Sequence, residues 1–300
     1  MLLSLAVAVL QLVSFTFAQR PPPVLIYSKT AGFRHDSIPV AISALKDIAD
    51  RTSLYTPTFS EDEALFTSKG LSKFKAIVFL STTEQVLTKS GEVAFADWLT
   101  KGGSIVGLHS ATACLFNDTA FGTAMGSWFN RHPETELSLF LSFTFTKVID
   151  HETVDMLPDR YTTFEEVYSF QTDPHGVEGW NYQGTPHPIA WLRDSGMNVD
   201  LSNGTAPPGQ AQRMNGKMWM TSLGHANETW ESKLHLAHVE AGLRWALADF
   251  NPSTIQMSLS PSPSSLSTSK SDSSSNFARS SLLSTLLLPG LLAATVLILS

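Results

Sequence analysis

Three histidines in this chain directly follow segments that have the pattern of a buried β-strand. His35 comes shortly after the apolar run 24–28, His109 follows the run 104–108, and His225 follows a late apolar run. Imidazole binds divalent metal ions and transfers protons near neutral pH. Ligands of open α/β sheets bind beyond the carboxyl ends of the strands. The sequence therefore predicts that these histidines lie together at one edge of a sheet.

The residues around His109 have the pattern of a nucleophile elbow, a sharp turn that lifts one side chain above the end of a strand. Gly102 and Gly103 introduce the strand, and the residue at the apex is a histidine. In glutamine amidotransferases of this fold the apex residue is a cysteine, whereas Cys114, the only cysteine here, lies five residues further on. Imidazole is a poor acyl-transfer nucleophile. The pattern predicts this scaffold without amidotransferase activity.

Other polar residues can complete such a site. His132 and the pair Glu165–Glu166 are candidates, and three histidines with one carboxylate suit zinc or another borderline divalent ion. No short ligand motif such as HExxH is present. The alternative is that each histidine is buried and hydrogen-bonded to the backbone. The remaining histidines are interpreted as structural: His151, His175, His187, His235 and His238.

Strand and helix patterns alternate through the part of the chain that carries these residues. A buried strand is predicted over 76–80, and amphipathic helices are predicted to start near Ser37 and to span 92–100 and 232–248. Repeated units of this kind indicate an α/β fold with a mostly parallel central sheet and helices on both faces, like flavodoxin or the class I glutamine amidotransferases.

The middle of the domain is less regular. Residues 137–149 alternate as a long strand, which is predicted to be antiparallel, and residues 159–185 are predicted to be mainly loop. Residues 19–250 are enough for one well-buried domain. With a single cysteine no disulfide within the chain is possible.

The amino terminus has the pattern of a secretory signal peptide. Residues 1–18 are apolar, are short for a membrane span, and end in small residues at the expected positions before a cleavage site. A buried helix at the amino terminus is the alternative. The mature chain is predicted to begin at Gln19.

The other end has the pattern of a glycolipid (GPI) anchor signal. Residues 251–281 are dominated by Ser, Thr and Pro and are predicted to form a stalk that contains the attachment site. Residues 282–300 are apolar, with no basic residue behind them, and are predicted to be removed. A tail-anchored helix is the alternative. The expected location is the outer face of the plasma membrane or the cell wall.

Glycosylation and charge agree with an extracellular location. Sequons occur at Asn117, Asn203 and Asn227. A glycan on Asn227 would crowd the mouth of a site containing His225. The formal net charge is −7 with no basic run, so nucleic acid is not expected as a partner.

Six motifs of the chain resemble those of the ThuA-like (trehalose-utilisation) family. They are Ser28–His35, Val106–His109, Phe129–Pro133, Glu165–Tyr168, His187–Trp191 and Leu223–His225. The resemblance runs from about residue 24 to residue 247. It implies a fold similar to that of class I glutamine amidotransferases without their Cys-His-Glu triad, and a carbohydrate ligand.

The resemblance and the positions of the motifs together favour an enzyme that acts on a sugar or keto-sugar by hydrolysis, elimination or isomerisation. His109, Glu165 and His225 are the predicted catalytic residues, with His35, His109 and His225 as ligands of a divalent metal. Residues predicted to bind substrate are Arg34, His35, His132 and Tyr168.

The alternative class is a non-catalytic module that binds carbohydrate or cell-wall glycan. Such a module would expose an aromatic strip, while its histidines would be scattered. The tryptophans that can form sugar-stacking surfaces are Trp128, Trp180, Trp191, Trp219 and Trp230, although tryptophans near strands more often belong to the core.

Overall fold

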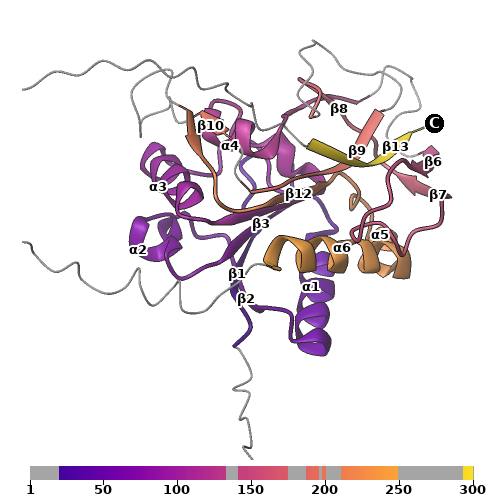
Figure 1. Ribbon diagram of the computed structural model, residues 1–300, viewed down its shortest axis with the longest axis horizontal. Helices are drawn as coiled ribbons and strands as arrows, with labels where there is room; N and C mark the ends of the chain where they lie inside the picture. The colour runs from indigo at the N-terminus through magenta and orange to yellow at the C-terminus, as the bar shows by residue number, and fades with distance from the viewer. Residues whose placement is uncertain are drawn as a thin grey trace, which may run out of the picture.

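The computed structural model describes residues 20–132, 141–174, 187–195, 198–200, 211–248 and 293–299. These residues form a central sheet with helices on both faces (Figure 1). The predicted signal peptide and stalk, together with His175, Trp180 and Asn203, lie outside the described residues. No helix within those ranges is long and apolar enough to cross a membrane.

Half of the sheet is parallel, as the sequence predicts. Its strands, in spatial order, are β2 (Thr56–Ser60), β1 (Pro23–Tyr27), β3 (Ala76–Leu80), β4 (Ser104–Leu108) and β12 (Met218–Thr221). All pair in parallel. The predicted runs 76–80 and 104–108 are confirmed as strands, and every residue in them is buried. Their carboxyl ends meet at one edge.

The other half of the sheet is antiparallel. Its strands continue the order as β9 (His187–Arg193), β13 (Ala293–Leu299), β6 (Leu141–Lys147) and β7 (Arg160–Glu165). The antiparallel strand predicted in 137–149 is confirmed as β6. The predicted loop over 159–185 is wrong for β7 and for β8 (Ser169–Phe170), which pairs with β5 (Phe129–Arg131). A further hairpin joins β10 (Asn198–Asp200) to β11 (Ala211–Arg213).

Strand β13 lies in the segment that the sequence predicts to be removed. It pairs antiparallel with β9 on one side and with β6 on the other. A strand inside a sheet cannot leave without exposing the hydrogen-bonding edges of both neighbours. This pairing and the predicted removal of 282–300 therefore exclude one another within one molecule.

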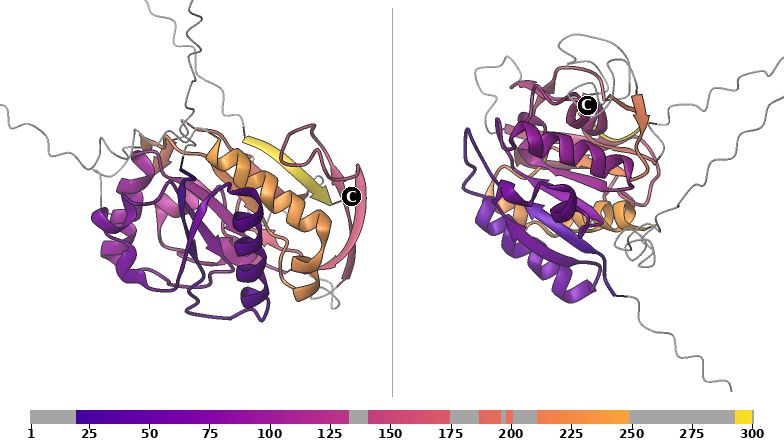
Figure 2. Two further views of the ribbon diagram at one scale, coloured as in Figure 1. Left: turned by 90° about the horizontal axis from the view of Figure 1, so that it is seen from below. Right: turned by 90° about the vertical axis from the view of Figure 1, so that its left-hand side faces the viewer.

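Helices cover both faces of the sheet (Figure 2). On one face lie α1 (Ile38–Thr52), α5 (Asn227–Glu231) and α6 (Lys233–Leu247), and on the other lie α2 (Ser68–Leu71), α3 (Lys89–Thr100) and α4 (Thr119–Met125). Two short 3₁₀ turns complete the helices, η1 (Glu63–Leu65) and η2 (His109–Ala113). The helix predicted to start near Ser37 is α1, and the Ser37 hydroxyl caps no amide but donates to the Gly224 carbonyl at 3.1 Å.

The tryptophans belong mainly to the two cores. Trp191, Trp219 and Trp230 are buried, so they do not form the sugar-stacking surface of the alternative, a carbohydrate-binding module. Trp128 is half-buried and donates its indole N–H to the Leu115 carbonyl. The interpretation of tryptophans near strands as core residues is confirmed for the three buried ones.

Candidate active site

His109 stands at the apex of the turn after β4. Its backbone has φ +55°, a left-handed conformation that non-glycine residues rarely adopt, and its side chain is fully buried. Nδ1 lies 2.9 Å from the Ser222 carbonyl oxygen, which only accepts hydrogen bonds. Nδ1 therefore carries the proton, and Nε2 of the neutral ring keeps a free lone pair. Burial, and then the neighbouring His35, hold the pKa of His109 well below its ordinary value.

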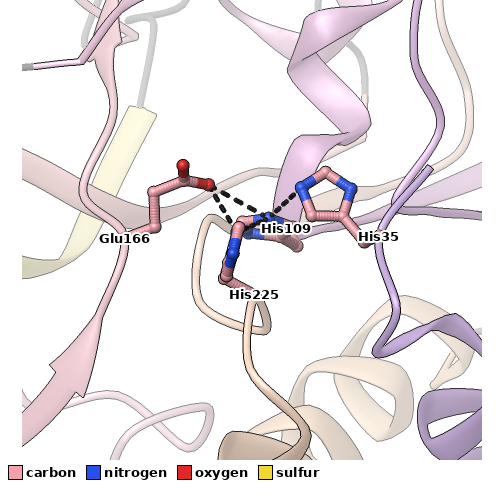
Figure 3. A group of neighbouring side chains, drawn as sticks. All are labelled: His35, His109, Glu166 and His225. Carbon is pink, nitrogen blue, oxygen red and sulfur yellow. Dashed lines mark hydrogen bonds and ion pairs between the residues drawn. The ribbon is translucent and has the colours of Figure 1, made fainter. Parts of the chain in front are cut away.

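Three groups surround that lone pair. His35 Nε2 lies 2.9 Å from His109 Nε2, the Tyr168 hydroxyl 3.0 Å and His225 Nδ1 3.3 Å. Figure 3 shows the three rings turned toward one another at the edge of the sheet. The structure thus brings together the three histidines that the sequence singles out, which come from the ends of β1, β4 and β12.

Glu166 is the carboxylate of this cluster. Its Oε2 lies 2.7 Å from His225 Nδ1 and 3.5 Å from His109 Nε2, and its Oε1 lies 3.4 Å from His132 Nε2. Burial alone would raise the pKa of the Glu166 carboxyl, but the hydrogen bond with His225 and the charges of His225 and His132 bring it below its ordinary value. Glu166 is therefore an anion at neutral pH.

Glu165 does not face the cluster, contrary to its predicted proton-transfer role. Its buried carboxylate accepts hydrogen bonds from the Gly224 amide at 2.8 Å, the Thr229 hydroxyl at 2.6 Å and the Glu166 amide at 2.9 Å. It also accepts the amide of His225. Glu165 therefore fixes the loop that carries His225. Burial raises the pKa of the Glu165 carboxyl, and these hydrogen bonds oppose that rise.

The donor set fits a divalent metal ion. One ligand atom from each of His35, His109, Glu166 and His225 lies within 4.8 Å of the others. One lone pair on His109 Nε2 cannot satisfy three surrounding polar groups as hydrogen bonds, whereas a cation would be coordinated by all the nitrogen lone pairs at once. Three imidazoles and one carboxylate are ligands that zinc prefers. The predicted three-histidine set is thus completed by Glu166.

Three residues of the cluster, His35, Glu166 and His225, line a cavity of about 640 Å³, whereas the fully buried His109 does not. This volume is within the range of small-molecule sites. Aromatic rings dominate its lining. The lining includes Phe33, Thr83, Glu84, Phe129, His132 and Tyr168. Of the predicted substrate-binding residues, His35, His132 and Tyr168 line this cavity.

Arg34 does not line the cavity. Its guanidinium pairs with the Glu61 carboxylate at 2.7 Å, and both side chains are about half exposed. The predicted substrate-binding role of Arg34 is therefore not supported by its position. Successive side chains in the loop after β1 lie on opposite sides of the backbone: Phe33 and His35 face the cavity, and Arg34 faces Glu61.

A second, smaller cavity of about 230 Å³ shares Phe33, His35 and His225 with the first. Asn227, the asparagine of a sequon, is exposed and lines this smaller cavity. It does not belong to the lining of the larger one. A glycan on Asn227 is therefore compatible with an open larger cavity, contrary to the crowding that the sequence suggests.

Two features of the site were not found from the sequence. The Ser222 carbonyl that sets the tautomer of His109 is a backbone group, and no residue type marks it. Glu84 lies on the cavity wall with φ +60°. The residues around it in the sequence do not predict this left-handed conformation. His151, His187, His235 and His238, interpreted as structural, all lie outside the cluster.

Comparison with known proteins gives the family. Residues 23–246 match the family model of ThuA, described as trehalose utilisation. None of the curated proteins matched the chain. A solved protein described as ThuA-like from Bacteroides uniformis is similar with a TM-score of 0.55 and 14% identity, over 80% of this chain and 98% of that one. Another from Parabacteroides merdae has a TM-score of 0.49 and 13% identity, over 75% and 90% of the two chains.

The likeness to the Bacteroides uniformis protein supports the fold alone, because the sequence identity is low. The family match extends further, since it spans both halves of the described sheet and includes all four residues of the cluster. The chain therefore belongs to the ThuA family.

Proposed function

We propose that this protein is a carbohydrate-active enzyme that acts on a sugar or keto-sugar with the help of a divalent metal ion, for which zinc suits the donor set best. The observation that carries the proposal is the cluster of His35, His109, Glu166 and His225, of which three residues line a cavity large enough for a sugar. The description of the family, trehalose utilisation, supports the substrate class.

The four cluster residues would hold the ion, and Ser222 would orient His109 through its carbonyl, as outer partners of metal-binding histidines commonly do. When bound, the ion would polarise a carbonyl or hydroxyl oxygen of the substrate. Glu165 keeps the His225 loop in place from below.

Tyr168 is the group best placed to hold a proton beside the reacting atoms. Burial, and then the charge of Glu166, raise the pKa of the Tyr168 hydroxyl well above its ordinary value, so it stays protonated. The Tyr168 hydroxyl oxygen lies 3.0 Å from His109 Nε2, and Tyr168 itself lines the cavity. Tyr168 can therefore donate a hydrogen bond to a substrate oxygen, a role that general acids serve in hydrolysis, elimination and isomerisation.

We also propose that the protein is a secreted glycoprotein held at the cell surface or in the wall by a glycolipid. In that mature form residues 282–300 would be removed, and the pairing of β13 with β9 and β6 would belong to the precursor alone. Support comes from the apolar amino terminus and from the Ser/Thr/Pro-rich segment before an apolar tail. The sequon asparagines Asn117 and Asn227 are exposed, as glycosylation requires. Wall glycan would then be the nearest source of substrate.

Metal analysis tests the enzyme proposal. The purified protein is expected to bind about one zinc ion per chain, and His109→Asn, whose side chain tolerates the left-handed backbone, is expected to lose it. The matched control His151→Asn changes a half-buried histidine outside the cluster and should keep the ion. Equal metal content in His109→Asn and wild type, or no zinc binding by the wild type, would refute the proposal.

A further inference from the structure

Glu84 is a carboxylate without a described function on the wall of the larger cavity. It follows β3, its side chain is exposed, and its backbone has φ +60°. Within the described part of the chain no hydrogen bond engages its carboxylate. Non-glycine residues held in this conformation concentrate at functional sites, because the surrounding structure must compensate for the strain.

Hydrogen bonds on both sides hold this strained segment. Toward β1, the Ala31 amide donates to the Thr83 carbonyl at 2.9 Å. Toward η2, the Glu84 amide donates to the Ala113 carbonyl at 2.9 Å, and the Leu115 amide donates to the Glu84 carbonyl at 3.1 Å. The backbone of Glu84 is thus fixed independently of its side chain, which is left for a ligand.

Gly32 leaves room for the Glu84 side chain. A methyl group at Gly32 would lie 2.4 Å from Glu84 Cγ, closer than non-bonded carbons approach. The side chain of Glu84 therefore packs along the backbone of Gly32 while its carboxylate remains on the cavity wall. Any side chain at position 32 would displace it.

Glu84 also lies where the fold binds ligands. The strand order β2-β1-β3-β4 changes direction between β1 and β3. In open α/β sheets, ligands bind in the crevice at such a switch point. Glu84 follows β3, and Phe33 and His35 follow β1, so all three border this crevice.

The cavity carries negative charge. Glu84 and Glu166 line it, and no lysine or arginine does so among the described residues. The nearby cations are already paired, Arg34 with Glu61 and Lys29 with Glu63. A divalent ion would add two positive charges, which the two carboxylates offset. Away from the ion, a phosphate group beside Glu84 would meet a like charge that no lysine or arginine of the described lining neutralises.

We propose that Glu84 is a specificity residue that binds hydroxyl groups of an uncharged sugar and disfavours sugar phosphates and sugar acids. A carboxylate can accept two hydrogen bonds from neighbouring hydroxyls of one ring. The inference rests on the proposed function, because it assigns the substrate class of that same site.

Binding of trehalose and glucose, and of their 6-phosphates, to the zinc-loaded protein tests the inference by calorimetry. The wild type is expected to bind an uncharged sugar at least 10-fold more tightly than its phosphate. Glu84→Gln keeps the size of the side chain and should weaken the uncharged sugar about 10-fold while narrowing the preference over the phosphate. The matched control Glu231→Gln, at an exposed position outside the cavity, should change neither.

Zinc content is measured in parallel and should be unchanged in Glu84→Gln. If the phosphates bind as tightly as the uncharged sugars, or Glu84→Gln binds like the wild type, the inference is wrong while the proposed function stands. If the zinc-loaded wild type binds none of the four compounds, the sugar-directed function is itself overturned, and the inference with it.

Discussion

Two consecutive glutamates serve different purposes in this site. Neighbouring side chains at the end of a strand point in opposite directions. Glu165 therefore turns toward the amides of the His225 loop, while Glu166 turns toward the histidines. The sequence marks both as candidates for the site, but it cannot say which one faces the histidines, because that depends on where the unpredicted strand β7 ends.

Substitution of each glutamate should separate positioning from ligation. Glu165→Gln replaces a carboxylate that accepts several hydrogen bonds, so we expect a loss of about 2 kcal/mol in the free energy of unfolding, with zinc affinity reduced about 10-fold through the displaced loop. Glu166→Gln should abolish most zinc binding with little loss of metal-free stability. Urea unfolding and zinc titration of both variants measure the difference; the same pattern in both would contradict it.

Two buried histidines on α6 make stability depend on pH. Burial, and then the charge of His238, lower the pKa of His235 from 6.5 to about 3. Burial lowers the pKa of His238 from 6.5 to about 4. Below pH 6.5 these two histidines bind protons in the unfolded chain but stay neutral in the folded chain. Stability is therefore full above pH 6.5 and falls as the pH drops toward 4, by about 1.4 kcal/mol per unit for each histidine.

Removing one of these histidines should flatten that dependence. Between pH 7 and pH 5, His235→Leu is expected to lose about 2 kcal/mol less of its unfolding free energy than the wild type. His235 packs against Trp230, and neither of its ring nitrogens has a hydrogen-bond partner in the described residues, so the apolar replacement suits the site. Urea unfolding at both pH values gives the comparison, and equal slopes would refute the assignment.

At the scale of the elements, the sequence predicts best where burial alone decides the structure. The fully buried runs 76–80 and 104–108 are strands with the expected bounds. Strand β7, predicted as loop, alternates between exposed and half-buried residues and depends on its pairing with β6. The histidine cluster was predictable because each histidine follows a predicted strand. The roles of Glu84 and Ser222 were not, because they depend on a left-handed backbone and on a backbone carbonyl, which no residue type marks.

Helix α5 combines a sequon with a structural hydrogen bond. Thr229 is the third residue of the sequon at Asn227, and its buried hydroxyl donates to Glu165. Asn227→Gln removes only the sequon and is expected to leave stability and zinc binding unchanged. Thr229→Ala removes both and should lower the unfolding free energy by about 1–2 kcal/mol, and Thr229→Ser should restore it. Equal melting of the Asn227 and Thr229→Ala variants would show that the hydrogen bond contributes nothing.

Truncation of the chain tests whether the nine-stranded sheet needs β13. A chain that ends at residue 281 lacks β13 and would leave the edges of β9 and β6 unpaired. We expect a lower melting temperature and concentration-dependent association, because unpaired edges bind one another. An unchanged, monomeric truncation would show that β13 is dispensable and would support the removal predicted from the sequence.

The four residues of the cluster come from distant parts of the chain, between residues 35 and 225. An ion held by all of them would act as a cross-link that closes very long loops and that the unfolded chain cannot form. Binding and folding would then share one free energy, so that an ion at 100 times its dissociation constant adds about 2.7 kcal/mol to stability. A nascent or cleaved chain would lack the site altogether, and zinc supply would govern how long the protein persists.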